Sequence, residues 1–296
     1  MNFPLLHSAV TIMTPILFAG IGGLFTELSG MLNIALEGLL LTGAFAAAAG
    51  AYYTGSMAAG IAAGILSSLV LSCILGLVIL RLRSNVFIAG LAVNLLAGGL
   101  SVVLSFHLFG KRGVVNLPSL SPLPTLQLTS IPVLSDLFSN HNPYMYASLL
   151  TLALSALILY QTPFGFRLRS CADHAGALVS LGINPDSYRL SAYLISGLCC
   201  GIGGSSLSLG LGAFVPNISS GKGWVALVVI FLGNRKPLGL LGAAFIFGLA
   251  EAFSNYAQGI FHIGTDFILA IPNIFTLLAM IGISVYTGRQ KQNTAP

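Results

Sequence analysis

Two acidic residues, Glu37 and Glu251, lie inside long apolar runs of this 296-residue sequence. A carboxylate at membrane depth is costly, so it normally faces a helix-bundle interior or an aqueous cavity and has a partner. Three uncharged polar residues, Asn33, Asn94 and Asn255, occupy similar runs. All five are candidates for the pathway of a solute or ion and its supporting network. Clamps between helices would use the same residue types, and the sequence leaves both interpretations open.

No motif of a soluble catalytic centre occurs in the sequence. Gly110-Lys111 and Gly221-Lys222 lack the upstream glycine and the following Ser or Thr of a nucleotide-binding P-loop. Neither HExxH nor GxSxG is found. The four cysteines show no metal-ligand spacing and are expected to pack as small apolar side chains. We therefore expect no enzyme activity, no cofactor and no metal in this chain.

A polar segment, 162–189, separates two apolar stretches. Its charged and titratable side chains are Arg167, Arg169, Asp173, His174, Asp186 and Arg189. Ser170 to Asp173 fits a capping box and predicts the start of a helix, which Leu181-Gly182 would end. Asn184-Pro185 predicts the N-cap and first residue of the next helix. Such a short helix at the membrane surface suits contact with a soluble partner; a solvated helix without a partner is the alternative.

The elements that carry these residues are predicted from composition. Only 12 basic and 7 acidic residues occur and 56% of the chain is hydrophobic, whereas soluble domains have about 25% charged residues. Charge-free runs cover 38–80, 84–110, 190–221 and 267–288. Each is long enough to cross a ~30 Å hydrocarbon core as a helix of about 20 residues. Continuous apolar runs argue against a β-barrel, so we predict an all-α, polytopic membrane protein.

The expected architecture is a single transmembrane domain, 1–296, with about eight to ten helices, some broken or half-length. The segment 224–233 is too short to cross alone and would join irregular backbone in 210–223. A proline-rich loop is expected at 111–143. Glycine patches at 20–23, 98–99 and 201–204 predict close helix packing. The expected spans are 6–26, 30–50, 58–80, 86–109, 144–161, 189–210, 224–233, 237–257 and 266–286.

Basic residues predict the orientation. Nine of the twelve fall on one side, which the positive-inside rule assigns to the cytoplasm. The segment 162–189 and the C-terminus are then cytoplasmic, and the loop 111–143 is external. The N-terminus is external if all nine spans cross. The first apolar run, 4–25, lacks a basic n-region, so no cleavable signal peptide is predicted. The pI of about 9.2 fits this bias and implies no nucleic-acid partner.

Several blocks of the sequence are similar to one transporter family. They are Leu24–Gly38, Phe164–Ser170, Leu181–Asn184, Ser196–Gly197, Gly201–Gly204, Ser220–Leu227 and Phe247–Ala252. On these blocks the chain resembles the permease subunits of bacterial ABC importers for simple sugars and nucleosides, in the ribose/branched-chain amino acid permease superfamily. It most resembles the smaller permease of nucleoside systems with basic-membrane-protein-type binding lipoproteins. The resemblance covers nearly the whole chain.

The resemblance implies a multi-pass subunit of the bacterial cytoplasmic (inner) membrane. Its implied partners are a second permease, as a hetero- or homodimer, two ABC ATPase subunits or one tandem ATPase, which bind ATP and Mg, and an external substrate-binding protein. The segment 162–189 would couple ATP hydrolysis to alternating access. Its implied ATPase contacts are Arg167, Arg169, Asp173, His174 and Gly182.

The solute class also follows from the resemblance alone. A nucleoside is the first expectation, with a riboflavin-like flavin or a simple sugar next. A second hypothesis is an ion- or proton-coupled secondary transporter that uses Glu37 and Glu251 as proton carriers. Against it, the sequence shows no symmetric pair of interrupted helices with a matching carboxylate motif.

Overall fold

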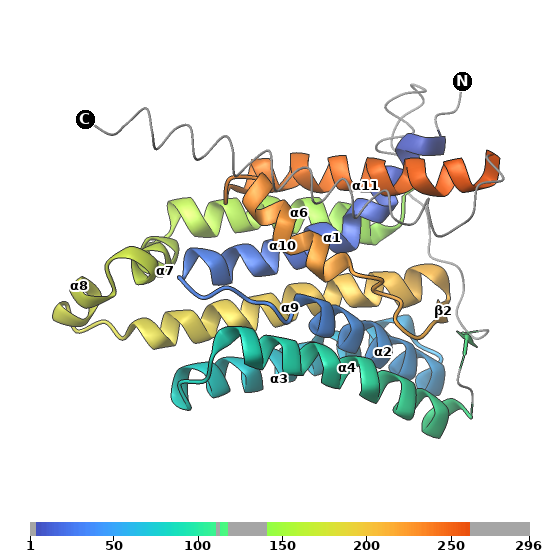
Figure 1. Cartoon of the computed structure of the whole chain (residues 1–296), viewed down its shortest axis with the longest axis horizontal. Helices are drawn as coiled ribbons and strands as arrows, with labels where there is room; N and C mark the ends of the chain where they lie inside the picture. Colours follow the sequence, from blue (N-terminus) through green and yellow to red (C-terminus); the bar gives the residue numbers. More distant parts are fainter. Residues whose placement is uncertain (1–3, 111–112, 118–140, 261–296) are drawn as a thin grey trace.

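The computed structural model describes residues 4–110, 113–117 and 141–260, which form a bundle of helices (Figure 1). The helices are α1 (Pro4–Leu28), α2 (Leu36–Thr54), α3 (Met57–Arg81), α4 (Val86–Phe109), α6 (Pro143–Gln161), α7 (Pro163–Asp173), α8 (Ala175–Ser180), α9 (Pro185–Leu211), α10 (Lys222–Leu232) and α11 (Pro237–Ile260). Two short strands, β1 (Val115–Asn116) and β2 (Ala213–Phe214), pair antiparallel.

Six of the described helices, α1, α3, α4, α6, α9 and α11, are long and apolar enough to cross a membrane. This confirms the all-α, polytopic prediction. Helix α10 is a shorter apolar helix of 11 residues, as its sequence predicted. The predicted last span, 266–286, lies outside the described residues, as does most of the loop 111–143.

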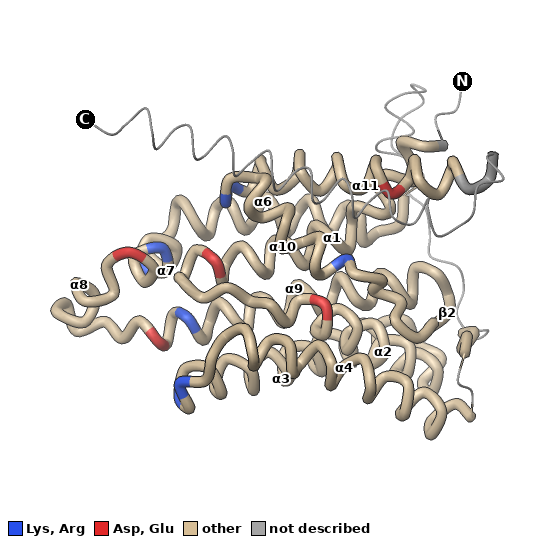
Figure 2. Tube along the Cα trace, viewed as in Figure 1, with Lys and Arg blue, Asp and Glu red and all other residues tan. Residues whose placement is uncertain are grey.

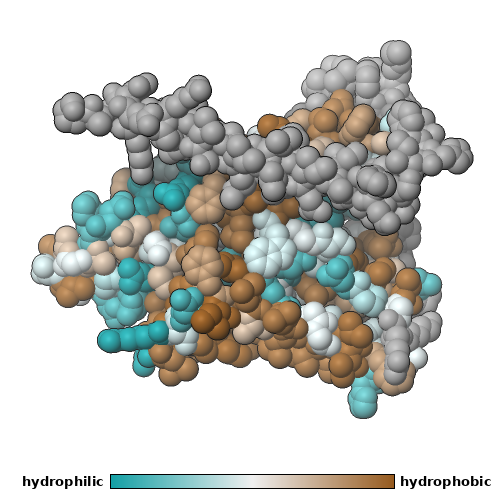
Figure 3. Space-filling view, in the orientation of Figure 1, coloured by the Kyte–Doolittle hydropathy of each residue, from teal (hydrophilic) through white to brown (hydrophobic). Residues whose placement is uncertain are grey.

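Helix α9 is the central element of the bundle because it packs against α1, α2 and α3. Helix α1 is almost entirely buried, whereas α3 and α4 turn large apolar side chains outward, Leu66 and Leu95 among them. Apolar side chains dominate the lower part of the space-filling view, where α3 and α4 lie (Figure 3). Outward-facing leucines suit a lipid environment, so α3 and α4 have the surface expected of helices that contact the bilayer.

Small residues bring α9 and α3 close together. A Cβ added at Gly201 would lie 2.6 Å from the Cα of Ile65, and the Ser72 hydroxyl donates to the Tyr193 carbonyl at 2.5 Å. The prediction of close packing is confirmed for the patch 201–204. It is wrong for Gly98 and Gly99, whose added Cβ atoms would meet nothing within 4 Å among the described residues.

The two ends of the bundle differ in chemistry. Helices α7 and α8 lie at one end, where hydrophilic side chains gather, and the β1–β2 pair lies at the other (Figures 1 and 3). Lysines and arginines gather around α7 and the nearby ends of the long helices (Figure 2). The positive-inside rule predicts that this end faces the cytoplasm and that the β1–β2 end faces outward.

Candidate functional site

Two breaks in the helical backbone organise the middle of the molecule. One is the segment 29–35 between α1 and α2, and the other is the segment 215–221 before α10. Asn217 and Ser220 adopt positive φ angles of 58° and 45°, which are uncommon for residues other than glycine. Irregular backbone at membrane depth needs partners from the surrounding protein. The polar residues predicted from the sequence supply many of them.

Glu37 holds the second break. Its carboxylate accepts hydrogen bonds from the Ser219 hydroxyl at 2.6 Å and from the backbone N–H groups of Gly221 at 2.9 Å and Gly223 at 2.7 Å. A Cβ added at Gly223 would overlap the backbone N and Cα of Glu37. Glu37 is 9% exposed. The geometry is that of a clamp between α2 and the start of α10.

Asn33 and Asn94 hold the first break. The Asn33 amide donates to the Ser196 hydroxyl at 2.9 Å, and its oxygen accepts from the Ala35 N–H at 3.0 Å. Asn94, on α4, accepts from the Gly38 N–H at 2.7 Å and donates to the Ile34 carbonyl at 2.9 Å. The first N–H groups of a helix have no partner within it, so Asn94 caps α2 from a neighbouring helix.

The other two candidates, Glu251 and Asn255, lie on α11, and Glu251 reaches the start of α10 through Lys222. The Glu251 carboxylate pairs with the Lys222 ammonium at 3.0 Å, and the two side chains are 26% and 13% exposed. Asn255 is exposed and lines a surface hollow with Ser8 and Tyr256. The structure therefore brings Asn33, Glu37 and Asn94 together at the two breaks, whereas Asn255 stands separately.

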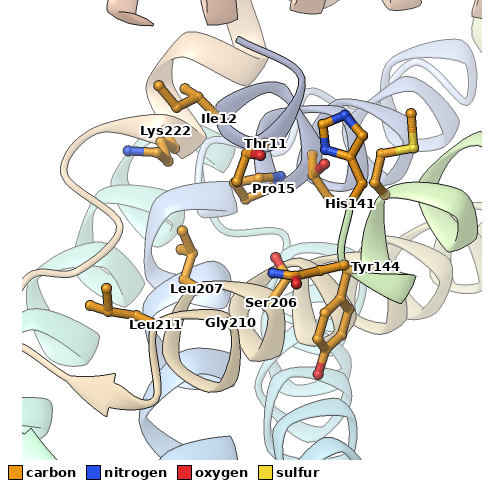
Figure 4. Close-up of a pocket in the computed structure, with 13 residues that line it drawn as sticks. Thr11, Ile12, Pro15, His141, Tyr144, Ser206, Leu207, Gly210, Leu211 and Lys222 are labelled. Atoms are coloured by element: carbon orange, nitrogen blue, oxygen red, sulfur yellow. The ribbon is translucent and has the colours of Figure 1, made fainter. Parts of the chain in front are cut away.

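A cavity of about 220 Å³ lies between α1, α6, α9 and the start of α10 (Figure 4). It is in the half of the bundle away from α7, because the first residues of α6 and the last turns of α9 line it. Its polar lining comes from Thr11, Thr14, His141, Asn142, Ser206 and Lys222. None of the five pathway candidates is among the residues that line it. Sequence reasoning missed it because hydroxyl and amide side chains scattered over three helices leave no local motif.

The segment 162–189 folds differently from the prediction at its start. Helix α7 begins after Thr162, whose hydroxyl accepts from the Gly165 N–H at 3.2 Å, with Pro163 as its first residue. The capping box predicted at Ser170 is wrong: Ser170 lies inside α7 and donates to the Phe166 carbonyl. Threonine followed by proline is the stronger start, since proline is pre-organised for the first helical position.

The single helix predicted over Ser170–Gly182 is also wrong, because it is divided at His174, whereas the end of the segment is as predicted. Helix α7 stops at Asp173, and α8 follows a break at His174. Gly182 adopts a φ of 74°, and the Ile183 N–H closes the turn on the Leu178 carbonyl at 2.9 Å. Asn184 caps α9 by accepting from the Asp186 N–H. These contacts confirm the predicted end at 181–182 and the predicted N-cap of the next helix.

The predicted docking side chains have different surroundings. Arg167 is exposed and donates to the Tyr188 hydroxyl at 3.0 Å. The Arg169 guanidinium stacks over the Tyr160 ring, 4.7 Å from its centroid. Asp173 and His174 are exposed at the break between α7 and α8. Two apolar residues beyond them, Val179 and Leu181, are 62% and 74% exposed, so the tip of the segment presents an apolar surface.

Arg189 anchors this segment, a role that sequence reasoning missed. Its guanidinium donates to the Cys171 carbonyl at 3.0 Å and to the Ser29 carbonyl at 3.5 Å, and pairs with Asp186 at 3.2 Å. Close by, a Cβ added at Gly30 would lie 3.0 Å from the Cα of Ala172. Thus α7 rests directly on the first break. Burial raises the pKa of the Cys171 thiol, which stays protonated and packs as an apolar group.

A second anchor joins α1 to the α10–α11 turn. The Arg235 guanidinium pairs with the Glu27 carboxylate at 2.9 Å. Glu27 is mostly buried, although Arg235 is exposed. No local pattern in the sequence marks this pair, because the two residues are about two hundred positions apart.

Comparison with known proteins identifies the family of this chain. The model of the branched-chain amino acid transport system / permease component family matches residues 5–284. The chain belongs to this family. As a family member it is a multi-pass permease subunit of an ABC transporter, a non-catalytic part whose work depends on ATPase and binding-protein partners. The family therefore favours ATP-driven transport over the secondary-transporter hypothesis.

Three relatives match most of the chain. The guanosine ABC transporter permease protein NupQ of Bacillus subtilis is 33% identical over 95% of this chain and 92% of its own length. The nucleoside ABC transporter permease protein NupC of Lactococcus lactis is 28% identical over 90% of this chain and 88% of its own length. The putative glucose ABC transporter permease protein TsgC13 of Haloferax volcanii is 27% identical over 86% of this chain and 78% of its own length.

A solved structure shares the fold. An inward-facing transporter described as a metal-chelate-type ABC transporter superposes with a TM-score of 0.52 over 96% of this chain and 86% of its own. Its sequence identity is 16%. The likeness supports the all-α permease fold and says nothing about the solute.

Proposed function

We propose that this chain is a permease subunit of an ATP-driven importer that moves a nucleoside, with guanosine as the leading candidate, into the cell. The observation that carries the proposal is the similarity to the guanosine permease over nearly the full length of both chains. A simple sugar is the second candidate because of the Haloferax volcanii relative. Riboflavin, which the sequence resemblance also suggested, gains no support from these relatives and is not proposed.

The positions of the cavity between α1, α6 and α9 and of the segment 162–189 are consistent with an importer. The cavity lies in the proposed outer half, where a binding protein would deliver a solute. Its volume of about 220 Å³ is smaller than the ~300–1,000 Å³ of ordinary small-molecule sites. Transport would therefore require the surrounding helices to move apart, as alternating access demands.

The segment 162–189 is the proposed site of ATPase docking. It projects at the cytoplasmic end and exposes Val179 and Leu181 at its tip. Arg189 and the Gly30–Ala172 contact connect it to the break between α1 and α2. The contact residues proposed from the sequence are Arg167, Arg169, Asp173, His174 and Gly182. A second permease, either two ATPases or one tandem ATPase, and a binding protein complete the proposed assembly.

Uptake into proteoliposomes tests this function. The chain would be reconstituted with its cognate second permease, ATPase and binding protein, with ATP supplied on the ATPase side. We expect uptake of labelled guanosine that requires both ATP and the binding protein. Excess unlabelled glucose should not reduce this uptake. An ATPase variant unable to hydrolyse ATP is the matched control.

Two results would contradict the proposal. Guanosine uptake driven by a proton gradient without ATP would replace it with the secondary-transporter hypothesis. ATP-dependent uptake of glucose, with no uptake of guanosine, inosine or adenosine, would keep the importer but change its solute to a sugar.

A further inference from the structure

One charged side chain borders the outer cavity. Lys222 is the sole lysine, arginine, aspartate or glutamate among the described residues that line it. It is the first residue of α10, and its side chain is 13% exposed. In the close-up, its ammonium nitrogen points away from the other lining residues, so the aliphatic stem is the part beside the cavity (Figure 4).

The Lys222 ammonium has one recorded partner in the described part of the chain. It donates to the Glu251 carboxylate at 3.0 Å, and Glu251 lies outside the cavity lining. An ammonium has three donors, so this bond leaves donors for a further acceptor. A lysine side chain also rotates about several single bonds. To donate into the cavity, the ammonium would turn about these bonds from the position in which it pairs with Glu251.

The Lys222 backbone is held on both sides. Gly221 and Gly223 each donate an N–H to the Glu37 carboxylate. The base of the side chain is thus fixed by Glu37, and its tip is held by the ion pair with Glu251. This arrangement gives a positioned donor whose last atoms can move.

We propose that Lys222 recognises the transported solute by donating to acceptor atoms of a 6-oxopurine base in the outer cavity, with Glu251 neutralising the ammonium. The inference rests on the proposed function and names the base class that this site would take. Guanine presents two adjacent acceptors, O6 and N7, which lysine and arginine bind well. Adenine presents an acceptor next to an amino donor, which a donor-only ammonium binds poorly.

Glu251 has a separate role in this proposal. With the pair intact, the Glu251 carboxylate balances the charge of the Lys222 ammonium, which suits an uncharged nucleoside. Loss of the carboxylate would leave a partly buried positive charge beside the cavity. That charge would attract a nucleoside monophosphate, since lysine is a common phosphate ligand.

Equilibrium binding to the whole transporter complex in nanodiscs, without binding protein or ATP, tests the inference. The probes are labelled guanosine, adenosine and guanosine monophosphate. We expect the unsubstituted complex to prefer guanosine to adenosine about tenfold. Lys222→Met should weaken guanosine binding about tenfold. Lys222→Gln should move the preference toward adenosine, because glutamine pairs with the N6–N7 edge of adenine.

Two further variants separate recognition from structure. Lys222→Arg keeps the donors and should retain the guanosine preference, whereas Glu251→Gln should raise binding of guanosine monophosphate about tenfold. Met and Gln at position 222 both remove the ion pair, so a purely structural loss would affect them alike. Gly99→Ala, in open space on α4, is the control for substitution as such.

The outcomes distinguish the inference from the proposed function. Equal losses of guanosine binding in Lys222→Met, Lys222→Gln and Glu251→Gln would show that the pair only joins α10 to α11, and would overturn the inference. Wild-type binding in every variant would also overturn it while ATP-driven guanosine uptake still stands. Absence of any nucleoside uptake by the unsubstituted complex would reject the proposed function itself.

Discussion

Glu37 and Glu251 are both carboxylates in apolar helices, yet they hold the start of α10 in different ways. Glu37 reaches it from α2 and accepts three hydrogen bonds, two of them from backbone N–H groups. Glu251 reaches it from α11 and binds the tip of the Lys222 side chain. Glu37 is 9% exposed, whereas the Glu251 side chain is 26% exposed.

These contacts distinguish a structural carboxylate from one that can exchange its partner. Several fixed donors around a carboxylate fit a clamp, because its removal leaves backbone groups without partners. One movable partner at the edge of a cavity fits a functional role, because the contact can exchange. The two sites therefore should respond differently to substitution, and the following changes test that difference.

The largest effect is expected at Gly223, on the Glu37 side. Gly223→Ala would place a methyl group against the Glu37 backbone, which has no rotamer with which to give way. We expect a loss of about 3 kcal/mol or more in the free energy of unfolding, measured as a drop in folded yield and thermal midpoint. In Gly99→Ala the added methyl meets open space, so stability should be unchanged or slightly higher.

Asn94 extends the Glu37 site and should show the next largest effect. Asn94→Leu would leave the Gly38 N–H and the Ile34 carbonyl without their side-chain partner. We expect about 2 kcal/mol of destabilisation, measured by thermal unfolding of the complex in detergent. If Asn94→Leu unfolds like the unsubstituted protein, the first break does not depend on this cap.

The Lys222–Glu251 pair should contribute less to stability. Both side chains keep some exposure, so solvent screens the pair. We expect Lys222→Met to cost about 1 kcal/mol, well below the Gly223 and Asn94 variants. A thermal shift as large as that of Asn94→Leu would show that the two carboxylate sites are alike after all.

The smallest effect on folding is expected at the α7–α8 end of the bundle. Arg167 is exposed, so Arg167→Glu should leave the thermal midpoint near that of the unsubstituted protein. Its charge reversal should instead reduce the amount of ATPase that co-purifies with the chain. Unchanged co-purification of the ATPase would remove Arg167 from the proposed docking surface.

The sequence predicted the spans and the helix ends better than the partners of single residues. Long apolar runs and residues such as Asn184 and Gly182 act locally, so α9 and the end of the segment 162–189 could be predicted. The capping box at Ser170 failed because Thr162-Pro163, eight residues earlier, starts a helix that passes through it.

The parts that could not be predicted depend on contacts distant in the chain. Glu37 meets residues more than 180 positions away, and Arg189 meets Ser29 across 160. No local pattern records such pairs. The sequence therefore marked Glu37 and Glu251 as unusual but could not show that they share a target, the start of α10.

Paired substitution of the two carboxylates tests the central distinction most directly. Folded yield and ATP-driven guanosine uptake per folded complex would be measured for Glu37→Gln and Glu251→Gln. We predict that Glu37→Gln loses much of its folded protein, since glutamine offers one acceptor oxygen where the carboxylate uses two. Glu251→Gln should fold near the wild-type level and change solute selectivity. Normal folding of Glu37→Gln together with loss of folded Glu251→Gln would contradict the assignment of Glu37 as a structural clamp and of Glu251 as a functional residue.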